Sequence, residues 1–157
     1  MDSALKQKFT MRLSQCNKGE LIVIMYDMIF TYMDEAYLAK EAGNHDAFKL
    51  AVKNGQDVIS SLIHALDFSY DVSKQLYSLY VYCRNMLAKA LYQYSTDGIE
   101  ESQKILKRLY EAFSEAAKTD TSGPLMRNTQ RVYAGMTYGR NTLNENCYDD
   151  NHRGFFV

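Results

Sequence analysis

The sequence is poor in residues that interrupt regular structure and in patterns that build covalent cross-links. It has one proline, Pro124, and eight glycines in 157 residues. So few breakers in so long a chain favour long helices over many short strands. The three cysteines, Cys16, Cys83 and Cys147, lie far apart and form no Cys-x-x-Cys pair. This pattern argues against a disulfide framework or a zinc site and is typical of a reducing cytoplasm.

The sequence also lacks an excess of charge of either sign. Eighteen basic and 19 acidic residues give a formal net charge of −1. A general nucleic-acid binder needs a clear basic excess, so this class of protein is excluded. An apolar fraction of 46% with so little net charge also argues against disorder of the whole chain, and the length suits one domain.

Long apolar runs are missing as well. The longest, Leu21 to Met25, falls far short of the roughly 20 residues that a membrane span needs. The N-terminal residues contain no apolar segment of the kind found in a secretory signal peptide. We therefore expect no membrane insertion.

No pattern in the sequence supports catalysis. His45, His64 and His152 show no metal-ligand spacing with another histidine, a cysteine or a carboxylate, and the Glu-x-x-His motif of di-iron bundles does not occur. A Gly-rich phosphate loop and a Gly-x-Ser-x-Gly motif are also missing. Cys83 falls on a predicted core stripe, where a thiol is structural. We predict no enzyme activity, no cofactor and no metal site.

Hydrophobic periodicity and capping residues predict one short helix followed by four long ones. The short helix spans residues 4–13. Asn17, with Glu20 three residues later, has capping-box spacing and opens the first long helix, which ends near residue 42 at Gly43-Asn44. Further long helices are expected over about residues 45–66, 72–94 and 98–117.

The short connections between these helices decide the predicted fold. They make sequence neighbours run antiparallel, so we predict an all-α fold: an antiparallel up-down four-helix bundle with a short extra N-terminal helix and a partly helical C-terminal tail. The bundle domain is predicted to span residues 1–117. The tail, residues 118–157, is expected to hold a marginal helix near 124–138, where Pro124 suits a first-turn position, and then a poorly ordered end.

Two of the long helices carry more apolar surface than one bundle seam requires. One interpretation is that they are diagonal partners in the bundle and more buried, or are covered by the N-terminal helix and the tail. The other is a hydrophobic groove for a partner helix, for which tyrosine and methionine are well suited. The extra stripes are Val23, Tyr26, Phe30, Met33 and Tyr37 on the first long helix, and Tyr77, Val81, Ala88 and Tyr92, with Arg84 among them, on the third.

Four segments of the sequence occur in an order and spacing that is similar to one known family. They are Leu21-Ile-Val-Ile-Met25-Tyr26-Asp27-Met28, Gly43-Asn44-His45-Asp46, Leu66-Asp67, and the stretch from Gln75 to Leu87 with Leu76, Leu79, Tyr80 and Tyr82. Together they resemble the FliS family of flagellin-specific export chaperones over about residues 5–117. The chain departs from the family pattern at Met28, where the family has glycine, and in lacking a Gly-Gly before the third long helix.

The resemblance implies a cytoplasmic, non-enzymatic chaperone that holds the C-terminal segment of flagellin and prevents premature filament polymerisation. It implies partner contacts from one set of side chains on the first long helix, Tyr26, Phe30, Met33 and Tyr37. A second set, Tyr77, Tyr80, Val81, Arg84 and Ala88, lies on the third, with Arg84 meeting a client carboxylate. Leu5, Phe9 and Leu13 of the N-terminal helix are expected to cover the groove when no client is bound.

Two further expectations accompany this interpretation. Leu79, a position of the family motif, is expected in the core rather than at a contact surface. Other flagellar export components are additional candidate partners. The alternative function is a helical-bundle adaptor that uses its extra apolar stripes to self-associate.

Overall fold

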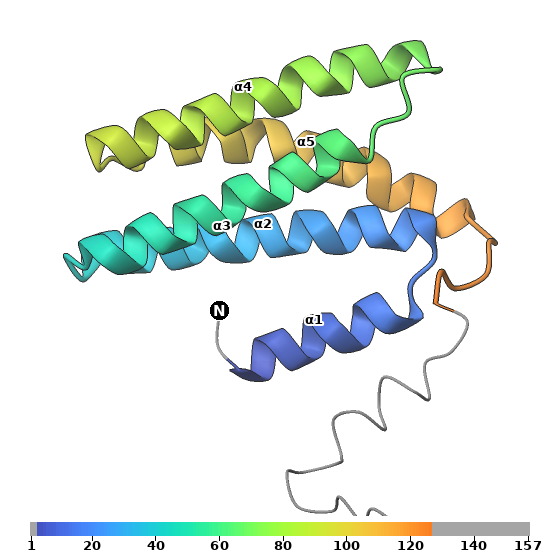
Figure 1. Cartoon of the computed structure of the whole chain (residues 1–157), viewed down its shortest axis with the longest axis horizontal. Coiled ribbons are helices and arrows are strands. Elements are labelled where there is room, and N and C mark those ends of the chain that lie inside the picture. The colour runs from blue at the N-terminus through green and yellow to red at the C-terminus, as the bar shows by residue number, and fades with distance from the viewer. Residues whose placement is uncertain (1–2, 127–157) are drawn as a thin grey trace, which may run out of the picture. The chain divides into compact units, whose positions relative to one another are not determined.

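All regular structure in the described part of the chain is helical. The computed structural model describes residues 3–126. The helices are α1 (Ser3–Gln15), α2 (Lys18–Glu41), α3 (His45–His64), α4 (Asp71–Gln93) and α5 (Asp97–Thr119) (Figure 1). The predicted all-α class is therefore confirmed, and each helix begins and ends within a few residues of its expected position.

The predicted helix of the tail lies mostly beyond this region. Pro124, Leu125 and Met126 are not helical. The rest of the predicted helix, from residue 127 to 138, lies outside the described residues, as does the end of the chain. The division into a domain of residues 1–117 and a tail of residues 118–157 stays a prediction.

The four long helices pack together as a bundle. α2 contacts α3 and α5, and α4 contacts the same two helices. α2 and α4 are therefore diagonal to each other, with α3 and α5 between them. Among the described helices, α1 contacts α2 alone (Figure 1).

Local hydrogen bonds explain where α2 and α3 begin. The side chain of Asn17 accepts from the Glu20 N–H at 2.8 Å, and the Glu20 carboxylate accepts from the Asn17 N–H at 3.0 Å. This is the predicted capping box. Asn44 caps α3 in the same way by accepting from the Ala47 N–H at 3.0 Å. Gly43, with φ at 65°, makes the left-handed turn between the two helices.

The start of α5 lies close to α4 because Gly98 has no side chain. A Cβ at this position would collide with the Met86 carbonyl oxygen of α4. One turn later the buried Ser102 hydroxyl lies 3.2 Å from the Cys83 carbonyl oxygen and 2.8 Å from that of Gly98. The absence of a side chain at Gly98 and the hydrogen bonds of Ser102 therefore allow the backbones of α4 and α5 to pack closely here.

A pair of tyrosines crosses the centre of the bundle from α2 to α4. The hydroxyl oxygens of Tyr26 and Tyr80 are 2.7 Å apart, and the side chains are only 0% and 1% exposed. One hydroxyl donates and the other accepts, so each satisfies the polar group of the other inside the core. The Tyr26 ring also lies 6.2 Å from the Tyr110 ring and 5.8 Å from the Phe113 ring, both of α5, measured between centroids.

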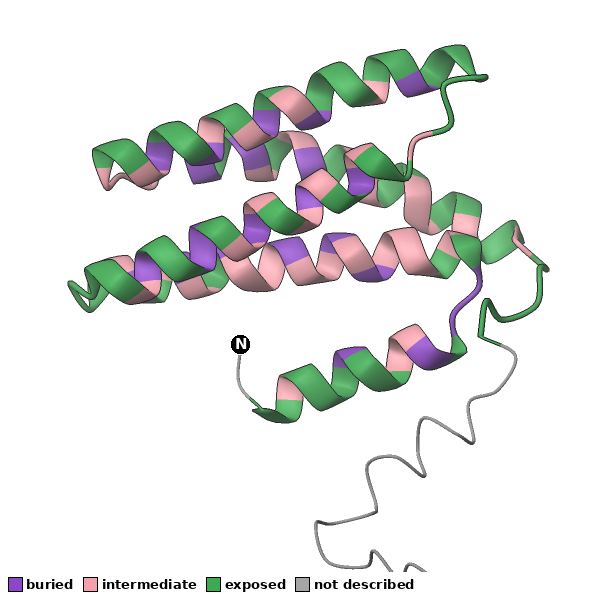
Figure 2. Ribbon diagram, viewed as in Figure 1, coloured by how far each residue is buried: buried purple, intermediate pink, exposed green. Residues whose placement is uncertain are grey.

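Aliphatic and aromatic side chains from all four long helices surround this pair. Figure 2 shows buried positions recurring along the inward sides of the helices. Other fully buried side chains of the core include Ile29, Phe48, Ile59, Leu62, Leu87, Ile99 and Leu106.

The expected core position of Leu79 is wrong. Its side chain is 36% exposed, whereas the next residue, Tyr80, is buried. Successive residues of an α-helix are about 100° apart, so turning Tyr80 fully inward rotates Leu79 to the flank of α4. A repeat of apolar residues did not show which member of an adjacent pair faces the core.

Replacing one member of the tyrosine pair leaves the other hydroxyl buried without its partner. Tyr26→Phe and Tyr80→Phe are each expected to lower the free energy of unfolding by about 1–3 kcal/mol, the usual cost of a buried unsatisfied polar group. The double variant removes both hydroxyls, so its loss should be smaller than the sum of the two single losses. Urea unfolding followed by circular dichroism measures all four proteins. Strictly additive losses would show that the two hydroxyls do not stabilise each other.

The same pair predicts loss of stability at alkaline pH. Burial raises the pKa of both Tyr26 and Tyr80 above the ordinary value of 10.0. In the unfolded chain these phenols ionise at about pH 10, while in the folded chain they stay protonated. Their contribution to stability is therefore complete below about pH 10 and is lost as the pH rises toward the folded pKa.

This alkaline loss can be assigned to the pair with the double phenylalanine variant. Between about pH 8 and about pH 11, urea midpoints are expected to fall more steeply for the unmodified protein than for Tyr26→Phe/Tyr80→Phe. Parallel falls in the two proteins would mean that other tyrosines cause the alkaline transition.

Candidate partner-binding surfaces

The predicted partner residues of α2 face the interior and the seam with α5. Tyr26 and Met33 are buried in the core. Phe30 is half-buried, and its ring meets the Tyr110 ring edge-on with centroids 5.6 Å apart. Tyr37 is also half-buried; burial raises the pKa of its phenol, and the nearby Glu100 carboxylate of α5 acts in the same direction. This set therefore packs α2 against its neighbours, and its partner role stays a prediction.

The predicted residues of α4 divide into one core residue and an accessible stripe. Tyr80 is buried, whereas Tyr77 is 43% exposed and Ala88 is exposed. Val81 and Arg84 lie between them in the sequence and are half-buried. Their spacing of four, three and four residues places them on one side of α4. We call Tyr77, Val81, Arg84 and Ala88 the α4 stripe.

The α4 stripe lies beside α3. The Arg84 carbonyl oxygen accepts a hydrogen bond of 3.0 Å from the Gln56 side-chain amide of α3. α2 and α4 are diagonal and meet through Tyr26 and Tyr80 in the interior. The two predicted sets of partner residues therefore do not form facing walls of one surface groove, because a neighbouring helix separates them on either side.

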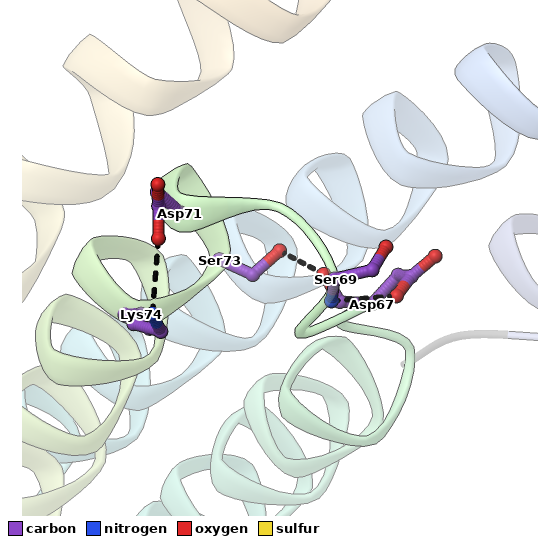
Figure 3. Close-up of polar contacts among 5 residues, drawn as sticks. All are labelled: Asp67, Ser69, Asp71, Ser73 and Lys74. Carbon is purple, nitrogen blue, oxygen red and sulfur yellow. Dashed lines mark hydrogen bonds and ion pairs between the residues drawn. The ribbon is translucent and has the colours of Figure 1, made fainter.

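A rigid connection between α3 and α4 supports one end of the α4 stripe. The Asp67 carboxylate accepts from the Ser69 N–H at 2.9 Å, and the Ser73 hydroxyl donates to the Asp67 carbonyl oxygen at 2.6 Å (Figure 3). The hydrogen bonds with Ser69 lower the pKa of Asp67. This turn holds Phe68 against Tyr77, with ring centroids 5.8 Å apart. The Leu-Asp segment that resembles the family thus has a structural role here.

α1 packs on a face of α2 that the predicted stripe of partner residues does not include. Phe9 is buried against Ile24, and Leu5 and Leu13 pack beside it. Arg12 forms an ion pair of 2.7 Å with Asp27 at the edge of this contact. The matching positions of α2, Leu21, Ile24 and Met28, follow a spacing of three and four residues that was visible in the sequence. Met28, where the family has glycine, fills part of the contact with α1.

A groove of about 550 Å³ lies between α1, α2 and α5. Val23, Ile24, Tyr110 and Ala117 supply its apolar lining, and Arg12, Glu20 and Lys118 supply charge. The Ser114 hydroxyl in this groove is buried and has no hydrogen-bond partner among the described residues. Burial raises the pKa of the Cys16 thiol, which also lines the groove. Sequence reasoning missed the α5 side of this groove because it found surplus apolar surface only on the first and third long helices.

The segment after α5 is attached to the start of α2. The Asp120 carboxylate accepts from the Gly19 N–H at 3.0 Å, and the Asp120 carbonyl oxygen accepts from the Asn17 side-chain amide at 3.2 Å. The Leu125 N–H donates to the Cys16 carbonyl oxygen at 3.0 Å. A carboxylate at the N-terminus of a helix is favourable because unpaired N–H groups and the helix dipole meet there. Part of the predicted tail therefore stabilises the bundle.

Neither a metal site nor a membrane span is found in the part of the chain that the structure describes. Within residues 3–126, no group of three or more histidine, cysteine, aspartate or glutamate side chains could hold a metal ion. None of the helices in that range is long and apolar enough to cross a bilayer.

These features define a helical-bundle protein with a core linked by two tyrosines, an accessible stripe on α4, and a groove between α1, α2 and α5. Residues 1–120 match the family described as flagellar protein FliS, a region that includes all five helices. The chain belongs to the FliS family, as its segments suggested. Proteins of this family are flagellar chaperones that bind flagellin. No match to an individual curated protein is found.

The Asp120 contact predicts a loss of stability in acid. Hydrogen bonds with Ser122, and then with the Gly19 N–H, hold the pKa of Asp120 below its ordinary value of 3.8. A lowered folded pKa gives stability that is present above the unfolded value and is lost as the pH falls toward the folded pKa. Asp120→Asn is therefore expected to lower the urea midpoint at pH 7 and to have a smaller effect at about pH 3, which is below the ordinary pKa of 3.8.

A matched control for this variant is Glu111→Gln, because Glu111 is an exposed carboxylate in the middle of α5. We expect the control to leave the urea midpoint unchanged at both pH values. Equal effects of Asp120→Asn in acid and at pH 7 would argue that the Asp120 charge does not stabilise the start of α2.

Proposed function

We propose that this protein is a cytoplasmic export chaperone that holds the C-terminal segment of flagellin on its bundle and prevents premature filament polymerisation. Membership of the FliS family supports a chaperone role and flagellin as the client. The α4 stripe is the observation that carries the choice of surface, because it is the part of the two predicted sets that combines an accessible aromatic side chain with an accessible small residue.

The chemistry of the α4 stripe suits a client that becomes ordered on binding. Ordering a disordered segment costs several kcal/mol, so its interface must be large and apolar rather than a few salt bridges. Tyr77 offers an apolar ring and a hydroxyl that tolerates water when no client is bound. Phe68 supports that ring, and the Arg84 guanidinium is available to a client carboxylate at the edge.

The other predicted residues take supporting roles in this proposal. Tyr26, Met33 and Tyr80 are buried and hold α2 and α4 in position. The groove between α1, α2 and α5 receives a further part of the client. In this proposal the three apolar side chains of α1 cover the face of α2 around Ile24 rather than the predicted partner residues, since α1 contacts α2 alone among the described helices and does not belong to the central core. These side chains are Leu5, Phe9 and Leu13.

We also propose that the protein is not an enzyme and that its helices are arranged as follows. The four long helices alternate in direction around one core within a bundle domain of residues 1–117. Residues 118–157 form a tail of which the first part braces the start of α2. Other flagellar export components are further candidate partners, and neither nucleic acid nor a membrane is a target.

Flagellin binding can be tested at the α4 stripe with two tyrosine variants of the same helix. Tyr77→Ala is expected to weaken binding of the C-terminal flagellin segment about tenfold or more, or about 1.4 kcal/mol, because an aromatic anchor is lost. Tyr82→Ala is the matched control, since Tyr82 is 39% exposed and its hydroxyl donates to the Glu101 carboxylate on the α5 side of the same helix, away from the stripe. Isothermal titration calorimetry measures both affinities, and circular dichroism checks that both variants are folded.

The two possible failures of this experiment have different meanings. If the unmodified protein does not bind the flagellin segment, the proposed function is wrong. If it binds and both variants bind equally well, the client occupies a surface other than the α4 stripe, and the groove between α1, α2 and α5 becomes the next site to test.

A further inference from the structure

The outer face of α2 is longer than the helix that covers it. Its first part, Leu21, Ile24 and Met28, lies against α1. The same spacing of three and four residues continues along α2 through Thr31, Glu35, Leu38 and Ala42. α1 has 13 residues and α2 has 24, so α1 leaves the C-terminal part of this face uncovered (Figure 1).

The uncovered part of this face borders a second groove. α2 and α3 form a groove of about 380 Å³, which we call the α2–α3 groove. Leu38 and Leu50 line it, and they are 66% and 61% exposed. Its other apolar residues are all small: Ala39, Ala42, Ala47 and Ala51. Because the alanines are small, the backbone of a partner helix could approach the groove closely. The two exposed leucines would then pack on either side of that helix.

Charge indicates the kind of helix that fits. Between Ser3 and Gln15, α1 has three basic residues and no acidic one, and its Arg12 pairs with Asp27 of α2. Glu35 is the charged residue that lines the α2–α3 groove. α2 thus binds a basic amphipathic helix at one end of this face and has an acidic residue, Glu35, at the other.

We propose that the α2–α3 groove is a second docking site, which binds a basic amphipathic helix of a partner protein end to end with α1. Continuity with the α1–α2 interface supports this occupant, because the two contacts share one face of α2 and one repeat of positions. The site consists of residues of α2 and α3 outside the α4 stripe, so it goes beyond the proposed flagellin surface.

A peptide with the sequence of residues 3–15 is a suitable probe, because it is the basic amphipathic helix that α2 already binds. The acetylated and amidated peptide is titrated into the full chain, and methyl NMR signals of leucine, isoleucine and methionine are recorded. We expect the Leu38 and Leu50 signals to shift on saturation. Leu38→Lys and Leu50→Lys are each expected to weaken binding about tenfold or more, since they place a basic group in the apolar contact, where it also repels the basic peptide.

Leu79→Lys serves as the matched control, because Leu79 is an exposed leucine of α4 outside the α2–α3 groove. It is expected to bind the peptide as the unmodified protein does. The proposal is overturned if no peptide binding is seen, or if only Ile24 and Met28 shift, which would mean exchange with α1. It is also overturned if Leu38 and Leu50 shift with protein concentration alone, because a second copy would then occupy the groove. These outcomes are independent of the flagellin affinities that the Tyr77→Ala experiment measures, so the two proposals can fail separately.

Discussion

The hydrogen bond between the Tyr26 and Tyr80 hydroxyls is the constraint on which the arrangement of the bundle depends. α2 and α4 are diagonal, and two tyrosines are long enough to meet between them in the interior. Because Tyr80 must point inward for this contact, the rotation of α4 about its axis is fixed. Tyr77, Val81 and Arg84 are then turned toward the α3 side, where the surface remains accessible. A polar contact in the core thus determines which apolar residues are left for a partner.

Several residues that carry the resemblance to the FliS family hold the fold rather than face the solvent. Tyr26 and Tyr80 form the central pair, Asn44 caps α3, and Asp67 orders the turn before α4. Each role needs one side chain with a specific polar atom at a specific place, so these residues are recognisable as motif positions. A surface such as the α4 stripe needs only apolar area of roughly the right shape, which many side chains provide.

The positions of the helices could be predicted from the sequence, but the faces that they bury could not. Helix ends depend on local signals, such as the Asn17 capping box and Gly43, and these could be read from neighbouring residues. The direction in which a helix faces depends on contacts between distant residues. For that reason the sequence placed Leu79 in the core, although it is exposed, and gave no reason to separate Tyr26 from Phe30. The sequence analysis expected α1 to cover the groove but missed the face of α2 that α1 contacts, because apolar residues on several sides of one helix cannot be ranked without knowing its neighbours.

The junction between α1 and α2 explains how α1 could act as a cover without endangering the bundle. The start of α2 is held by the Asn17 capping box, by the Asp120 carboxylate on the Gly19 N–H, and by Leu125 on the Cys16 carbonyl oxygen. None of these contacts involves the apolar side chains of α1. α1 buries its own small cluster around Phe9, separate from the core around Tyr26. Release of α1 would therefore expose one face of α2 while the first turn of α2 stays hydrogen-bonded, which is the property that a displaceable cover requires.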